Sequence, residues 1–209
     1  MEQIDFALAL AKTHELLSNS RSRTIIGIAG KPGAGKSQLS AFLMANLPAD
    51  LVALVPMDGF HLSNEELEEL GRRDRKGAPD TFDVEGYVNL LTEIRSNNND
   101  VIRYPIFHRE IEASIADEGL LASDVKLVIT EGNYLFHDQD GWEEISPLLD
   151  HRWFVGIDDS LRLDRLVARH HQFGKDLAAA HAWATGSDER NAQIVEASKF
   201  RADLIVLNQ

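Results

Sequence analysis

A glycine-rich loop that directly follows the apolar run 24–26 constrains the fold of this chain more than any other feature. The loop reads GIAGKPGAGKS over residues 27–37. Its glycines let backbone N–H groups curl around an anion without interference from a Cβ atom. Residues 30–37 fit the pattern G-x-x-x-x-G-K-[ST], which binds phosphate when a strand precedes it and a helix follows. The sequence therefore favours a phosphate-binding loop over a plain glycine-rich turn.

Several positions of this loop have an expected role in holding ATP and Mg²⁺. The helix that follows adds free N–H groups and the positive end of its dipole. Lys36 is expected to bridge the β- and γ-phosphates, and the Ser37 hydroxyl is expected to ligate Mg²⁺. The predicted nucleotide-binding residues are Gly30, Lys31, Pro32, Gly33, Ala34, Gly35, Lys36, Ser37 and Gln38.

Short apolar runs separated by helical patterns predict the architecture. Such alternation favours right-handed crossovers and a parallel sheet covered on both faces. We expect an α/β, three-layer P-loop NTPase fold with a mainly parallel five-stranded sheet, as one domain over residues 1–209. The predicted strands are 24–29, 51–55, 126–130, 153–157 and 204–207, and the predicted helices are 3–18, 35–47, 63–70, 84–95, 160–171 and 188–199. Residues 101–107 look extended, whereas 108–123 and 173–186 carry no clear pattern.

Charge and composition narrow the classes of partner and compartment. The formal net charge of −13 repels nucleic acid and anionic membranes, so neither is an expected partner. The chain has no cysteine, which excludes disulfides and thiolate chemistry. The first residues lack the basic and apolar regions of a signal peptide, and no apolar run approaches the length of a membrane span. These features predict a cytoplasmic protein.

Two acidic residues stand where predicted strands end. Asp58 follows the second strand in PMDGFH, and Glu131 ends the third strand in ITEGN. Ligands of parallel α/β sheets sit beyond the carboxyl ends of the strands. Asp58 could there accept a proton from an attacking hydroxyl, or could only cap a turn. Glu131 could organise Mg²⁺ and its waters, or could be a turn residue.

Three arginines form a stripe on the predicted helix 160–171. Arg162, Arg165 and Arg169 are spaced at i, i+3 and i+7, and their clustering in an acidic chain suggests an anionic partner rather than a merely solvated face. The segment 162–187 could be a small helical lid that closes on the phosphates and excludes water.

The order of motifs resembles the pantothenate kinase, uridine kinase and phosphoribulokinase group of P-loop kinases. The likeness covers about residues 23–207. Within the group it is closest to bacterial proteins named as fructose transport system kinases or as uncharacterised members of a nucleoside/nucleotide kinase family. The resemblance implies that Asp58 is the catalytic base and that Glu131 is the acidic residue near Mg²⁺. It also implies a phosphate-contacting Arg169, and homodimers are common in the group. The matching pieces are GIAGKPGAGKS, PMDGFH, KGAPDTFD, YPIFHR, ITEGNY, RLDRLVARH and NAQIVEASKFRADLIV.

The residues that would bind the phosphate-accepting substrate are less well defined. The resemblance places Phe82 in a substrate-side loop, and His61 could reach acceptor hydroxyls or could be a packed residue. Relatives usually carry Asp or Ser where this chain has His108, so the polarity of the pocket is open. Arg109 could bind an anionic group on the acceptor or lie on the surface. Tyr104 could contribute to an aromatic clamp around a base.

The combined reading is an ATP- and Mg²⁺-dependent kinase that transfers the γ-phosphate to a hydroxyl of a small metabolite such as a sugar, a nucleoside or a pantothenate-like compound. The predicted catalytic residues are Lys36, Asp58, Glu131 and Arg169, and the predicted acceptor-site residues are Asp58, His61, Phe82, Tyr104 and Arg109. The guanine-specifying N-K-x-D motif and the L-S-G-G-Q motif are absent. The alternative is an ATP-binding sensor or assembly protein without metabolite kinase activity.

Overall fold

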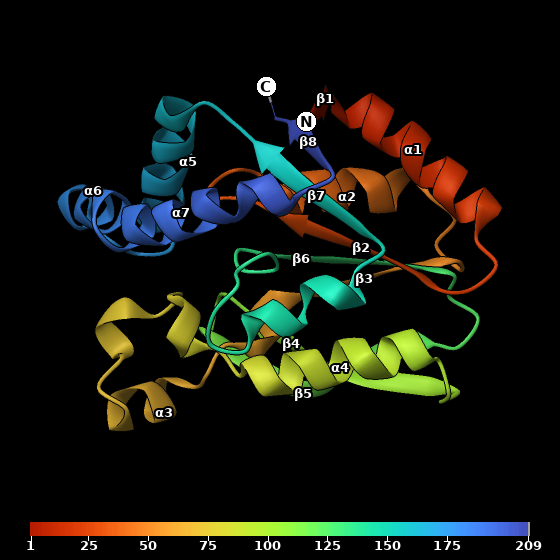
Figure 1. Ribbon diagram of the computed structural model, residues 1–209. Coiled ribbons are helices and arrows are strands. Elements are labelled where there is room, and N and C mark those ends of the chain that lie inside the picture. Colours follow the sequence, from red (N-terminus) through yellow and green to blue (C-terminus); the bar gives the residue numbers. More distant parts are fainter. Residues whose placement is uncertain (209) are drawn as a thin grey trace.

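The computed structural model describes residues 1–208, and within them the strands form two sheets. Every pairing in the larger sheet is parallel, and the strand order is β1-β8-β7-β2-β6-β3 (Figure 1). The prediction of a mainly parallel sheet is confirmed, but the sheet has six strands rather than five. They are β1 (Glu2–Ile4), β2 (Thr24–Ala29), β3 (Val52–Pro56), β6 (Leu127–Gly132), β7 (His151–Gly156) and β8 (Leu204–Leu207).

Helices cover both faces of this sheet, as a parallel sheet requires. On one face α1 (Phe6–Asn19) and α2 (Lys36–Asn46) bury apolar side chains such as Leu39 and Leu43. On the other face α4 (Val84–Ser96) and α7 (Ser187–Ser198) pack over a second cluster, in which Trp142 and Phe154 are fully buried. The three-layer prediction is therefore confirmed.

The sixth strand corrects the predicted helix 3–18. The Asp5 side chain accepts a hydrogen bond from the backbone N–H of Leu8 and caps α1, so the helix begins at Phe6. The residues before this cap are extended and pair with β8 as β1. A three-residue strand has no periodicity of its own, and only the neighbouring β8 makes it recognisable.

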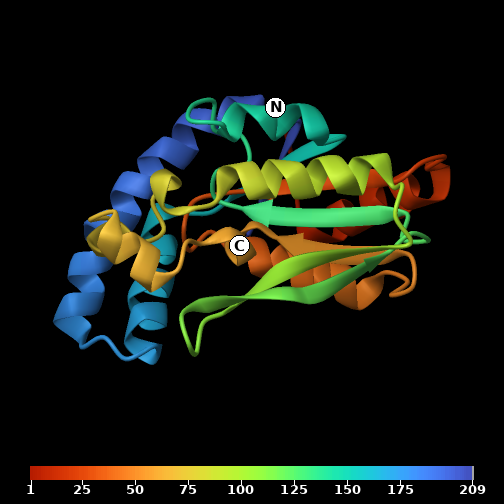
Figure 2. The same ribbon diagram turned by 90° about the horizontal axis from the view of Figure 1, so that it is seen from below.

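The segment 108–123, which carries no clear sequence pattern, contains the turn and the return strand of a hairpin. Strand β4 (Val101–His108) pairs antiparallel with β5 (Ala113–Ala122), and the hairpin packs beside the short 3₁₀ turn Met57–Phe60 that follows β3. Gly59 permits the approach, because a Cβ there would lie 2.2 Å from the backbone oxygen of Pro105. Figure 2 shows that the hairpin's turn projects toward the end of the molecule where α5 and α6 lie.

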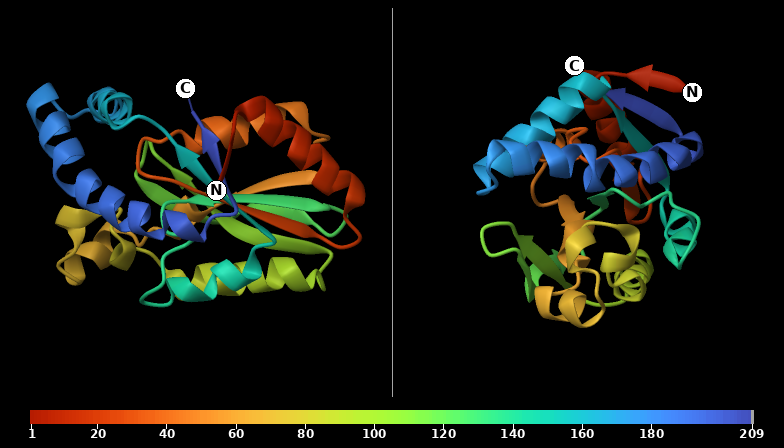
Figure 3. Two further views of the ribbon diagram at one scale, coloured as in Figure 1. Left: turned by 45° about the horizontal axis from the view of Figure 1, so that its top comes forward. Right: turned by 90° about the vertical axis from the view of Figure 1, so that its left-hand side faces the viewer.

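Three helices overhang the carboxyl end of the sheet. They are α5 (Asp159–Gln172), α6 (Leu177–Thr185) and the beginning of α7, and they face the segment around α3 (Asn64–Glu69) (Figure 3). Helix α6 lies in the segment 173–186 that the sequence did not resolve, inside the predicted lid 162–187. Movement of this lid stays a prediction.

The two ends of the described chain meet in one sheet through the pairing of β1 with β8. This pairing supports the single domain proposed over residues 1–209, which stays a prediction. Among the described residues, no helix is both long and apolar enough to cross a membrane.

Candidate active site

The loop between β2 and α2 has the backbone conformation that its glycines predict. Gly33 (φ +81°) and Gly35 (φ +93°) adopt positive φ values, which other residues rarely do. Gly35 is also the N-cap of α2, so the free N–H groups of the helix begin at the loop. A Cβ at Gly33 would lie 2.8 Å from Cγ of Leu166, so helix α5 packs directly on the loop.

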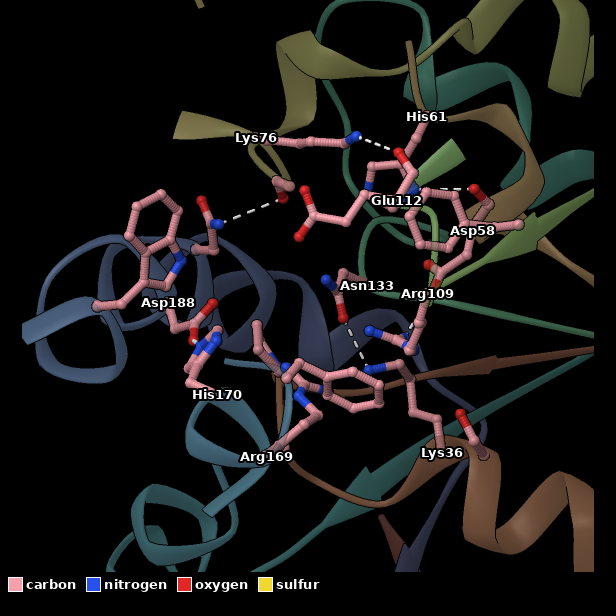
Figure 4. A pocket seen from close by; sticks show the side chains of 18 of the residues that line it. Lys36, Asp58, His61, Lys76, Arg109, Glu112, Asn133, Arg169, His170 and Asp188 are labelled. Atoms are coloured by element: carbon pink, nitrogen blue, oxygen red, sulfur yellow. Dashed lines mark hydrogen bonds and ion pairs between the residues drawn. The ribbon is translucent and has the colours of Figure 1, made fainter. Parts of the chain in front are cut away.

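A cavity of about 960 Å³ opens beside this loop, at the carboxyl ends of the strands (Figure 4). Its lining comes from the loop itself, the 3₁₀ turn after β3, the segment 73–77, the end of β6, the hairpin turn, and helices α5 to α7. This is the edge where parallel α/β sheets bind ligands. Of the predicted site residues, the cavity is lined by Pro32, Gly33, Gly35, Lys36, Ser37, Gln38, Asp58, His61, Arg109, Glu131 and Arg169.

The Lys36 ammonium is folded onto the loop. It donates hydrogen bonds to the backbone oxygens of Gly30 (2.9 Å) and Lys31 (3.3 Å) and to Oδ1 of Asn133 (2.7 Å). Burial lowers the pKa of Lys36 to about 8, although the carboxylates of Glu131 and Asp58 act in the opposite direction. Its only polar partners in the described chain are neutral oxygens, so the ammonium can exchange them for phosphate oxygens.

Glu131 and Ser37 fit the predicted metal site. Glu131 is 9% exposed, and its Oε2 is buried without a hydrogen-bond partner in the described chain. Burial raises the pKa of Glu131, while Lys36 and the neighbouring Ser37 hydroxyl lower it. No cluster of three or more acidic or histidine ligands occurs in residues 1–208. A few oxygen ligands beside a phosphate-binding loop suit Mg²⁺, which keeps its waters and is held largely by substrate phosphates.

Asp58 projects into the cavity and is paired with Arg109 from the hairpin turn. Nη2 of Arg109 donates to Oδ2 of Asp58 at 3.0 Å, and the carboxylate side chain keeps 34% of its surface exposed. Burial tends to raise the pKa of Asp58, but His61 in its protonated form and the cations Arg109, Lys36 and Arg169 outweigh burial and lower the pKa. Asp58 is therefore an ionised carboxylate that faces the phosphate-binding loop.

His61 lies between two aromatic rings next to Asp58. Its ring stacks at centroid distances of 4.1 Å on Phe82 and 4.8 Å on Phe107. Nδ1 of His61 lies 2.8 Å from the backbone oxygen of Asp58. Burial lowers the pKa of His61, against the charge of Asp58, so the ring is neutral near pH 7.

Two predicted acceptor residues do not line the cavity. Phe82 is buried behind His61, and Tyr104 is buried with its hydroxyl donating to the backbone oxygen of Leu54 at 3.0 Å. The family resemblance suggests Phe82 and aromatic character suggests Tyr104, but neither signal distinguishes a ring that contacts substrate from one that supports the wall. Here they hold the wall in place.

The three arginines of α5 have separate positions. Arg162 is 1% exposed and pairs with Asp159 and Glu189, so it fixes α5 beneath the loop. Arg165 contacts Oε1 of Gln38 at 3.3 Å. Arg169 lines the cavity, and within residues 1–208 its guanidinium has neither a hydrogen bond nor an ion pair.

Three predicted loop residues lie outside the cavity lining. Lys31 pairs with Asp159 at 2.6 Å, which directs its side chain to α5. Gly30 and Ala34 contribute backbone to the loop, and the Ala34 oxygen accepts from Nδ2 of Asn208 at 2.9 Å. Sequence reasoning also missed several lining residues, because the segments that carry them meet only in the folded chain. They are Arg73, Lys76, Glu112, Asn133, His170, Trp183, Asp188 and Asn191.

Comparisons with known proteins agree with this geometry. A model of the phosphoribulokinase/uridine kinase family matches residues 25–208. A crystal structure of the "putative fructose transport system kinase" from Silicibacter sp. TM1040 has a TM-score of 0.84 and 35% identity, over 97% of this chain and 98% of that one. YggC of Escherichia coli is 32% identical over 90% of this chain and 79% of its own length. Pantothenate kinase of Enterococcus faecalis is 34% identical over 66% of this chain and 46% of that enzyme. The chain thus belongs to the phosphoribulokinase/uridine kinase family and is an ATP- and Mg²⁺-dependent kinase of small molecules.

Proposed function

We propose that the protein transfers the γ-phosphoryl group of ATP to an alcohol group of a small metabolite, with Asp58 as the base. The observation that carries the proposal is that Asp58, Lys36 and Arg169 face one cavity from three separate segments. The acceptor would lie between Asp58 and the phosphate-binding loop. A sugar, a nucleoside or a pantothenate-like compound has such a hydroxyl.

The transfer forms a bond between the acceptor oxygen and the γ-phosphorus, and breaks the bond from that phosphorus to the oxygen bridging it to the β-phosphate. ADP leaves with that bridging oxygen, and the proton of the acceptor hydroxyl goes to the carboxylate of Asp58. Because the reaction needs little covalent help from protein groups, positioning and charge neutralisation supply most of the catalysis.

The remaining side chains have roles that follow from their charge. Lys36 would leave its backbone carbonyls for the β- and γ-phosphate oxygens. Ser37 and Glu131 would hold Mg²⁺, which when bound neutralises charge on the phosphates. Arg169, which has no partner in the described chain, would stabilise negative charge on the transferring group.

A sensor or assembly protein would bind ATP without needing an acceptor space. The cavity extends well beyond the loop, to the hairpin turn and to α7, and its far side contains a paired carboxylate and a stacked histidine. These features support a kinase. A homodimer and the exclusion of nucleic acid stay predictions.

The test is ADP release by the purified protein with ATP and Mg²⁺ against a panel of hydroxyl acceptors. The panel includes fructose, uridine, cytidine, pantothenate, glycerate and ribulose 5-phosphate. Acceptor-stimulated ADP release, with the phosphorylated product identified by mass spectrometry, is the expected result. ATP binding with no acceptor-stimulated release across the panel would contradict the proposal for these classes.

A further inference from the structure

Three cations, Arg73, Lys76 and Arg109, line the acceptor side of the cavity. Arg109 is paired with Asp58, and Nη2 of Arg73 lies 3.2 Å from Oε2 of Glu112. Lys76 is a third cation in this group and makes no ion pair within residues 1–208. Its ammonium donates to two neutral oxygens, Oδ1 of Asn64 at 2.7 Å and the backbone oxygen of Glu112 at 2.8 Å. One of its three N–H donors is left for another partner.

Lys76 and His61 belong to one subsite. The Lys76 ammonium lies 5.6 Å from the centroid of the Phe107 ring, and the same ring stacks on His61. Figure 4 shows Lys76, His61 and Asp58 around the same part of the cavity. Burial is the largest influence on Lys76 and lowers its pKa, so the site holds a partly desolvated cation.

The proposed reaction adds a second unsatisfied cation. Asp58 must release Arg109, at least in part, to take the proton of the acceptor hydroxyl. Once protonated, Asp58 no longer neutralises the guanidinium of Arg109, whose side chain is 45% exposed at the hairpin turn. The pair with Asp58 is the only ion pair of Arg109 within the described chain, so its guanidinium is then free to bind a different anion.

From this arrangement we infer that the acceptor carries an anionic group in addition to its hydroxyl, a carboxylate or a phosphate, held by Lys76 and Arg109. The inference rests on the proposed function and names the class of its acceptor. Charge-assisted hydrogen bonds from an ammonium and a guanidinium recognise either anion. A neutral sugar or nucleoside would offer no negative charge to these two cationic donors.

His61 adds a second element of recognition. The backbone oxygen beside its Nδ1 can only accept, so in the neutral ring Nδ1 carries the hydrogen and Nε2 is an acceptor. Because Nε2 accepts a hydrogen bond, it can bind a hydroxyl group of the substrate but not the substrate's anionic group. The favoured ligand is therefore a hydroxylated acid or a phosphorylated polyol.

Matched pairs of acceptors test the inference. Glycerate against glycerol, gluconate against glucose, and pantothenate against panthenol vary a carboxylate, and ribose 5-phosphate against ribose varies a phosphate. We expect kcat/KM for the charged member of at least one pair to exceed that of its neutral partner by about 100-fold, as two charge-assisted contacts allow. The pair that responds identifies which anion the site takes.

The possible results separate this inference from the proposed function. If the enzyme phosphorylates neutral members as fast as charged ones, the inference is overturned while the kinase assignment stands. If no member is turned over, the proposed function fails for the panel, and calorimetric binding decides the inference. Binding of charged members without any preference over neutral ones, or no binding, then overturns it.

Lys76 variants supply a second readout. Lys76→Met keeps the length of the side chain without its charge, and should lower the ratio of kcat/KM for charged over neutral acceptor by about tenfold. Lys76→Arg should restore most of that ratio, because it restores the charge. Lys126→Met, at the exposed amino end of β6, is the matched control. If thermal unfolding shows Lys76→Met folded and its ratio equals that of wild type, Lys76 does not bind the acceptor.

Discussion

The guanidinium of Arg109 and the carboxylate of Asp58 meet at 3.0 Å although 51 positions separate them in the chain. One comes from the turn of the β4–β5 hairpin and the other from the 3₁₀ turn after β3. The pair joins the residue proposed as the base to the residue proposed to bind the acceptor's anion. Binding of the acceptor and release of the base are therefore expected to be linked.

Asp58→Asn should lower kcat by about 10²- to 10⁴-fold, because an amide cannot take the proton of the acceptor hydroxyl. The Kd for ATP should change little, since the loop that holds the phosphates is intact. Steady-state kinetics and calorimetry check the two quantities separately. Asp50→Asn, exposed just before β3, is the control. Near-normal turnover in Asp58→Asn would remove Asp58 as the base.

Arg109→Gln should shift the pH dependence of kcat/KM toward higher pH on its acidic side. Arg109 is one of the positive charges that lower the pKa of Asp58, so its loss raises that pKa, and the active carboxylate form needs a higher pH. Arg103→Gln, exposed on β4 of the same hairpin, should keep the wild-type profile. An unshifted profile in Arg109→Gln would show that the ion pair does not affect the titrating group.

His61→Asn should reduce the dependence of stability on pH. Burial lowers the pKa of His61 from 6.5, and the facing groups are Asp58, Lys76 and Arg109. Between the lowered pKa and 6.5 the unfolded chain binds more protons than the folded one, so the free energy of unfolding falls as pH falls. Urea unfolding at about pH 7.5 and about pH 5.5 should show a smaller loss in His61→Asn than in wild type. His14→Asn, at an exposed position, should lose as much unfolding free energy between the two pH values as wild type does. Equal losses in all three proteins would contradict the lowered pKa of His61.

Lys36→Ala should weaken ATP binding by about 10- to 100-fold, the worth of a charge-assisted contact, and should lower turnover as well. ATP affinity and turnover should both fall, because the same ammonium binds the phosphates in the ground state and during transfer. Calorimetric titration with ATP and Mg²⁺ gives the first quantity and ADP release the second. Lys126→Ala controls for loss of a surface charge. Full activity with intact ATP binding in Lys36→Ala would refute the loop assignment.

Gly33→Ala should destabilise the protein more than Gly71→Ala does. Both glycines have positive φ, which costs an alanine about 1 to 2 kcal/mol. Only at Gly33 would the added Cβ meet neighbours, at 2.8 Å from Cγ of Leu166 and 3.0 Å from the backbone oxygen of Arg162, which adds about 1 to 3 kcal/mol. Nothing lies within 4 Å of a Cβ at Gly71. Denaturant unfolding measures the difference, and equal effects would mean that α5 does not press on the loop.

The parts of the fold that local patterns encode could be predicted from the sequence. Buried β-branched runs such as residues 24–29 identify parallel strands, and the glycine pattern identifies the loop. The strand Glu2–Ile4 could not be found, because it depends on pairing with residues 204–206, far along the chain. The return strand of the hairpin was missed because residues 113–118 are mostly polar or exposed and alternate poorly.

The site shows the same division. Asp58 and Glu131 could be located because each lies at the carboxyl end of a strand that the sequence predicts, Asp58 in the turn after β3 and Glu131 in the last residues of β6. Lys76 was read only as part of a motif, since its role depends on the hairpin turn that approaches it from residue 112. Tyr104 was assigned to the acceptor, but its hydroxyl bonds Leu54 within the wall. The direction in which a side chain points depends on tertiary contacts, so the spacing of residues in the sequence does not predict it.

The contact of Asn208 with the phosphate-binding loop has a consequence for synthesis of the protein. Its side chain donates to the backbone oxygen of Ala34 and to Oε1 of Gln38, across 174 and 170 positions. Translation produces the loop early, whereas Asn208 is added only after β8 has been made. A ribosome-bound chain that still lacks residue 208 would therefore lack these two hydrogen bonds to the loop and to α2.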